Sequence, residues 1–92
     1  MAKLDNNKIT DSHSTLTDTA REVVEIAQKY KEVSKIGIGF IDHTHSGRRD
    51  LKFININGGL KIKVVGSGAV QELYIYTNNP ELIKKNLTEF FL

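Results

Sequence analysis

The chain lacks cysteine and has no long apolar run. Without cysteine it can form no disulfide, no thiolate nucleophile and no cysteine-ligated zinc site. No segment approaches the ~20 consecutive apolar residues that a membrane-spanning helix needs. The polar residues 1–8 contain no apolar stretch of the kind found in signal peptides. These absences predict a cytoplasmic protein without a membrane segment.

The charges are nearly balanced, with 13 Lys and Arg against 11 Asp and Glu. The resulting net charge of +2 is too small by itself to predict a nucleic-acid partner. A length of 92 residues corresponds to one small domain, and a hydrophobic content of 39% is typical of a folded globular chain. Because residues 1–12 are polar and aperiodic, we predict a flexible N-terminal tail followed by a single domain over residues 13–92.

Apolar residues recur at helical spacing from about Leu16 to Lys31, which predicts a first amphipathic helix. The sequence allows two starting points for this helix, about one turn apart, because two pairs of residues have the spacing of a capping box. These pairs are Thr15 with Asp18 and Thr19 with Glu22.

Four strands follow, at about residues 36–41, 51–56, 60–64 and 72–76. In the first, Ile36, Ile38 and Phe40 alternate with Gly37, Gly39 and Ile41, and the two glycines indicate a bulge or a close backbone approach. In the third, the lysines alternate with apolar residues, so that they share one face. In the fourth, Glu72, Tyr74 and Tyr76 share one face.

Glycine-containing turns connect the later strands, and Asn57-Gly58 is the strongest hairpin indicator in the chain. Short turns imply antiparallel neighbours. Asn79-Pro80 then begins a closing helix. The prediction is an α+β fold of two layers, with a four-stranded antiparallel sheet and two helices on one face, in the order α-β-β-β-β-α. Phe90 and Phe91 lie at the end of the closing helix, where they either dock on the sheet of their own chain or help to form a homodimer.

All three histidines lie in polar segments that flank predicted elements. His43 and His45 are two apart, so in an extended strand both imidazoles point to the same face. His13 precedes the first helix, and Asp42 can add an oxygen ligand or orient an imidazole. Three imidazoles suit a divalent transition metal such as Zn²⁺ or Ni²⁺. The sequence therefore predicts a metal site at these four residues, with ordinary exposed histidines as the alternative.

A second hypothesis concerns basic and aromatic residues in and around the strands. A sheet face that carries both kinds of residue can bind single-stranded RNA or another nucleic acid. Glu72 shares that face, and a solvated outer face of the sheet explains the same residues. An arginine pair after Ser46-Gly47 can also hold an anion. The candidates are Arg48, Arg49, Lys52, Lys61, Lys63, Tyr74 and Tyr76.

Three short motifs carry a family resemblance: His13-Ser14-Thr15, Gly58-Gly59-Leu60-Lys61 and Val70-Gln71-Glu72-Leu73. Over roughly residues 12–85 the chain resembles an uncharacterised family of small prokaryotic predicted metal-binding proteins with a domain of unknown function. The resemblance implies metal binding without an assigned reaction, and it supports His13 in particular. Because no complete catalytic motif occurs, we predict a binding protein more than an enzyme.

Overall fold

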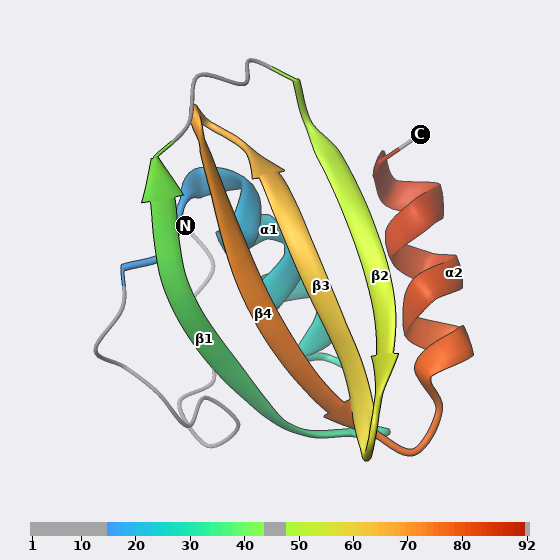
Figure 1. Cartoon of the computed structure of the whole chain (residues 1–92). Helices are drawn as coiled ribbons and strands as arrows, with labels where there is room; N and C mark the ends of the chain where they lie inside the picture. Colours follow the sequence, from blue (N-terminus) through green and yellow to red (C-terminus); the bar gives the residue numbers. More distant parts are fainter. Residues whose placement is uncertain (1–14, 44–47, 92) are drawn as a thin grey trace.

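The structure, a computed structural model, describes residues 15–43 and 48–91. The predicted order of elements, α-β-β-β-β-α, is confirmed (Figure 1). The elements are α1 (Asp18–Ala27), β1 (Val33–His43), β2 (Asp50–Ile56), β3 (Gly59–Gly66), β4 (Ala69–Thr77) and α2 (Pro80–Phe91). The predicted tail at residues 1–12 lies outside the described residues.

The four strands form one sheet in the order β1-β4-β3-β2. All neighbouring strands are antiparallel, as predicted. Two-residue turns join β2 to β3 and β3 to β4. In the second turn Ser67 and Gly68 both have positive φ, 58° and 74°, which matches the right-handed twist of a hairpin. β1 lies on the other side of β4, so the sheet places strands distant in sequence side by side.

Both helices lie on one face of the sheet. α1 packs against β3 and β4, while α2 packs against β2. Every second residue of β3 and β4 points toward this helical layer and is buried, which confirms the predicted faces of both strands. In the described part of the chain, neither helix has the length and apolar character to cross a membrane. The core is formed by Ala20, Val23, Val24, Ala27, Val33, Ile36, Ile38, Leu60, Ile62, Val64, Leu73, Ile75, Ile83 and Leu87.

The helix ends differ in how well they were predicted. α1 is shorter than expected, and its cap is Thr17, whose Oγ1 accepts a hydrogen bond of 3.1 Å from the Ala20 N–H. The two predicted capping pairs were therefore wrong, since Thr19 lies buried inside the first turn. α2 begins as predicted, with Pro80 in the first helical position and Asn79 Oδ1 accepting from the Leu82 N–H at 3.3 Å.

The two aromatic residues that end α2 have different surroundings. Phe91 packs against the core of its own chain, and the guanidinium carbon of Arg49 lies 4.7 Å from its ring centroid. Phe90 is 54% exposed and contacts Phe91 edge to face. Phe91 therefore docks on its own chain, whereas the homodimer stays a prediction.

A β-bulge interrupts β1. Ile38 pairs with Leu73 and Ile41 with Gln71, so Gly39 and Phe40 together occupy one place in the ladder. A Cβ on Gly39 would lie 2.9 Å from the backbone oxygen of Glu72. The predicted bulge and close backbone approach are confirmed at Gly39, while Gly37 pairs regularly with Tyr74.

Candidate functional site

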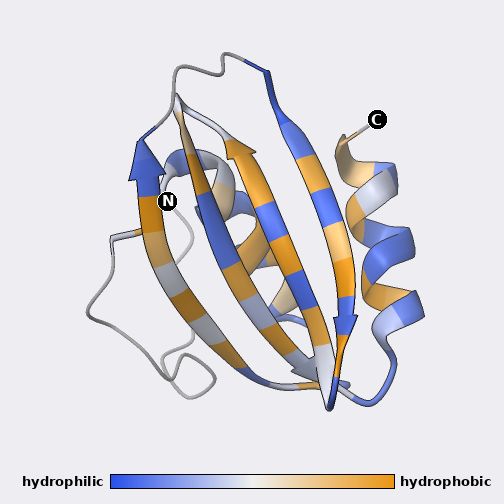
Figure 2. Cartoon of the chain, viewed as in Figure 1, coloured by the Kyte–Doolittle hydropathy of each residue, from blue (hydrophilic) through white to orange (hydrophobic). Residues whose placement is uncertain are grey.

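The sheet face opposite the helices, here called the open face, collects most of the predicted basic and aromatic residues. Directly opposed residues of antiparallel strands share a face, so the register defines its layout. In the described part of the chain neither helix covers it, and Figure 2 shows apolar and polar residues alternating along its strands. Its rows are Lys35–Tyr76–Gly59–Ile56, Gly37–Tyr74–Lys61–Ile54, Glu72–Lys63–Lys52 and Asp42–Val70–Val65–Asp50.

Charge is distributed unevenly along the open face. The first three rows carry four lysines and one acid, Glu72, whereas the fourth row carries Asp42 and Asp50 and no lysine. The Nζ of Lys35 lies 5.2 Å from the centroid of the Tyr76 ring. One end of the face is therefore basic and aromatic and the other is acidic.

Glu72 is held by two neighbours on the open face. Its Oε1 accepts a hydrogen bond of 3.2 Å from the Tyr74 hydroxyl, and its Oε2 lies 3.6 Å from the Lys61 Nζ. Partial burial of Tyr74, followed by this hydrogen bond and the negative charge of Glu72, raises the pKa of the Tyr74 phenol above its ordinary value of 10.0. Tyr74 is thus a neutral O–H donor at physiological pH.

A groove of about 530 Å³ is hollowed into the open face at the β1 bulge. The Phe40 ring stands at this groove and is 91% exposed. Its predicted alternation with Ile36 and Ile38 was wrong, because the bulge shifts the two-residue period by one position. The lining residues are Gly37, Ile38, Gly39, Phe40, Asp42, Lys63, Val70, Glu72 and Tyr74.

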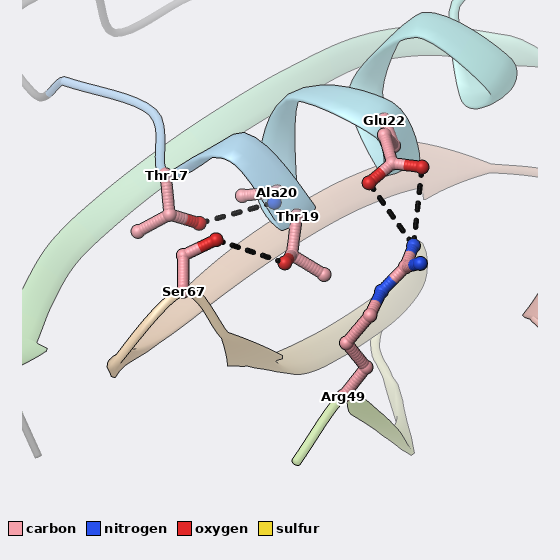
Figure 3. Close-up of polar contacts among 6 residues, drawn as sticks. All are labelled: Thr17, Thr19, Ala20, Glu22, Arg49 and Ser67. Atoms are coloured by element: carbon pink, nitrogen blue, oxygen red, sulfur yellow. Dashed lines mark hydrogen bonds and ion pairs between the residues drawn. The ribbon is translucent and has the colours of Figure 1, made fainter. Parts of the chain in front are cut away.

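Of the seven predicted nucleic-acid residues, five share the open face: Lys52, Lys61, Lys63, Tyr74 and Tyr76. Arg49 does not join them. Its Nη2 donates to both carboxylate oxygens of Glu22 on α1, at 3.1 and 3.0 Å (Figure 3), and its guanidinium covers Phe91. Arg48 is exposed, just before β2. Arg49 thus ties the helical layer to the start of β2.

The predicted metal ligands do not all lie on one face of the sheet. His43 pairs with Ala69, which places it on the helical side, while Asp42 lines the groove on the open face. His13 and His45 lie outside the described residues. Within residues 15–43 and 48–91, no three His, Asp or Glu side chains are grouped as a metal site requires.

A buried glutamine joins the segment before α1 to β1. Gln71 Nε2 donates to the backbone oxygens of Thr15 and Gly39, at 2.9 and 3.0 Å, and its Oε1 accepts from the Thr17 N–H at 3.1 Å. The hydroxyls of Thr19 and Ser67, 3.2 Å apart, link α1 to the turn between β3 and β4 (Figure 3). The chain entering α1 therefore lies beside the second half of β1.

Comparisons of the chain with protein-family models, curated proteins and solved structures found no match. The family resemblance accordingly stays a prediction. Two places in the fold carry candidate binding residues: the open face, and the end of β1 at His43.

Proposed function

We propose that this protein is a cytoplasmic module that binds single-stranded nucleic acid, above all RNA, on the open face of its sheet. The observation that carries the proposal is the convergence of lysines and tyrosines from three strands on a face that neither helix covers. The residues concerned are Lys52, Lys61, Lys63, Tyr74 and Tyr76.

These side chains supply the two interactions that single strands need. Lysines pair with backbone phosphates, which gives an affinity that falls with salt. Tyrosine rings stack with bases, and each stacked base contributes about 1–3 kcal/mol. Because Tyr74 and Tyr76 are two residues apart on β4, their attachment points are separated by roughly 7 Å along one face. They offer two successive stacking positions on the basic rows.

The acidic end of the face limits where a polyanion can lie. Asp42 and Asp50 occupy the outer strands in the fourth row, and like charges repel phosphate. A bound strand is therefore expected over the first three rows, across β4 and β3, with its phosphates near Lys61, Lys63 and Lys52.

The test is a fluorescence-anisotropy titration of a labelled single-stranded RNA at several salt concentrations. Replacing Lys52, Lys61 and Lys63 by Gln together should weaken binding and flatten the dependence of log K on log salt by about 0.7 for each lysine that pairs with a phosphate. The control variant replaces three lysines outside the open face, Lys29, Lys31 and Lys85, by Gln. Equal losses in both variants, or no binding by the wild type, contradict the proposal.

A second candidate function is the binding of Zn²⁺ or Ni²⁺ by His13, His43 and His45. The hydrogen bonds of Gln71 support it, since they hold Thr15, two residues after His13, against the strand that ends at His43. Three neutral imidazoles are a suitable ligand set for these ions. Asp42 faces the other side of the sheet, so we expect it to contribute little to the affinity.

Calorimetric titration of the metal-free protein tests this second function. Single His→Ala variants at positions 13, 43 and 45 should each weaken binding, and wild-type affinity should fall in acid, because protons compete with the metal for its ligands. Asp42→Asn is the matched control. If the triple histidine variant binds as tightly as the wild type, the metal site does not exist.

A further inference from the structure

We propose that the groove beside Phe40 is a nucleobase subsite that selects guanine, with Glu72 as the residue that distinguishes the base. This inference rests on the proposed binding of single-stranded RNA and names the part of the RNA that the groove would accept. It is carried by the position of one carboxylate beside an exposed aromatic ring, in a groove of the size that holds small ligands.

The groove has the shape and surface that a flat base requires. Gly37 and Gly39 carry no side chain, so backbone forms part of its floor beside Ile38. Phe40 is 91% exposed because the bulge turns it out of the core, and Tyr74 lies on the neighbouring strand. Each ring offers a face on which a base can stack, and such stacking is how proteins hold unpaired bases.

The hydrogen-bonding capacity of Glu72 determines which base fits. Each carboxylate oxygen can accept two hydrogen bonds. Oε1 already accepts one from the Tyr74 hydroxyl, and Oε2 is approached by the Lys61 ammonium, so within residues 15–43 and 48–91 one acceptor position remains on each oxygen. The two neighbours also fix the orientation of the carboxylate. A bidentate contact uses one acceptor position on each of the two carboxylate oxygens, which is the number that these neighbours leave.

Guanine is the base whose hydrogen-bonding edge matches this pair of acceptors. Its N1–H and its N2 amino group are adjacent donors. Cytosine and adenine each present one amino group next to an acceptor nitrogen, and uracil presents one imino group between two carbonyl oxygens. Only guanine can therefore give the carboxylate two parallel hydrogen bonds, and good bidentate contacts discriminate between bases by about tenfold or more.

The charge of Glu72 supports the same assignment. A carboxylate among Lys61, Lys63 and Lys52 repels phosphate, so it lowers the affinity of the face for any nucleic acid regardless of its bases. Hydrogen bonds from guanine to the Glu72 carboxylate offset this repulsion, whereas bases without two adjacent donors do not offset it. Removal of the charge should consequently raise the affinity for RNA without guanine while it lowers the preference for guanine.

The experiment compares short oligouridines that carry one central G, A, C or U, using anisotropy with wild type and Glu72→Gln. The wild type should bind the G oligomer about tenfold more tightly than the U oligomer. In Glu72→Gln this ratio should fall to about 1–2, while affinity for the U oligomer stays equal or rises. A merely structural role of Glu72 would instead lower all four affinities together.

Two further arms complete the test. Phe40→Ala, at a residue outside the core, should weaken binding of the G oligomer several-fold without changing the unfolding midpoint. Guanosine monophosphate alone should bind far more weakly than the G oligomer; equal binding would identify a free nucleotide as the ligand and overturn the RNA assignment. If the wild type binds all four oligomers equally, the guanine subsite is refuted and the proposed function stands. If it binds none, the proposed function itself fails.

Discussion

The two faces of the sheet differ in burial and in residue type, although the same strands form both. On the covered face, Leu60, Ile62, Leu73 and Ile75 are fully buried beneath the helices. Their identities are explained by burial alone, because roughly 25 cal/mol is gained for each Å² of apolar surface removed from water. On the open face, lysine, tyrosine and glutamate residues alternate with them and are not required by the core. The open face is therefore where residue types carry information about binding.

The largest expected effect separates the two faces directly. Leu73→Ala, in the centre of the covered face, should lower the free energy of unfolding by about 2–5 kcal/mol, because it removes buried methyl groups and leaves a cavity. Lys63→Ala, on the open face, should change it by less than about 0.5 kcal/mol. Urea denaturation measures both. A similar decrease in the two variants would mean that the faces are not energetically distinct.

A polar residue provides the next test, since Gln71 lies on the covered face and is fully buried. Gln71→Leu removes three hydrogen bonds, and at about 1 kcal/mol for each bond the free energy of unfolding should fall by roughly 3 kcal/mol. Hydrogen exchange at the Thr17 amide should become faster. Asn78→Leu, at an exposed amide, is the control. An unchanged stability would show that apolar packing at this position compensates for the missing bonds.

A smaller effect is expected at the N-terminal end of α1. Thr17→Ala removes the side-chain acceptor for the Ala20 N–H and should lower the free energy of unfolding by about 1 kcal/mol. Thr17→Ser keeps the hydroxyl oxygen and should retain most of the stability. Thermal unfolding of the two variants distinguishes the capping bond from the removal of a methyl group.

The smallest effect concerns Tyr74 on the open face. Its pKa lies above 10.0, so the contribution of the neutral phenol to stability is complete below about pH 10 and is lost as the pH rises through the higher folded pKa. Glu72→Gln removes the negative charge and should lower this pKa toward the ordinary value. Ultraviolet titration of tyrosinate, with Tyr74→Phe to identify the signal, measures the shift. No change in Glu72→Gln would show that the charge of Glu72 does not contribute to the raised pKa.

Prediction from sequence succeeded where the local period determines the outcome. Two-residue alternation in β3 and β4 was enough to separate the lysines and tyrosines from the core, and Asn79-Pro80 was enough to begin α2. Phe40 could not be assigned to its face, because the effect of a bulge depends on the register with β4. Local sequence also groups Arg49 with the lysines, because no local pattern reveals its ion pair with Glu22. The face of Phe40 and the ion pair of Arg49 both depend on residues that are distant in sequence.

The place of β1 beside β4 has a consequence for the order of folding. Ile56 and Gly59 pair across a turn, whereas Val33 pairs with Thr77, at the far end of the sheet-forming sequence. Hairpins close in about 1–10 μs, while pairing of distant segments must first overcome a larger loop-closure entropy. We therefore expect β2, β3 and β4 to assemble first and β1 to join last. In the native state we expect β1 to be the first strand to detach. The Phe40 groove and the hydrogen bond from Gln71 to Gly39 would then be lost together, while β2, β3 and β4 stay paired.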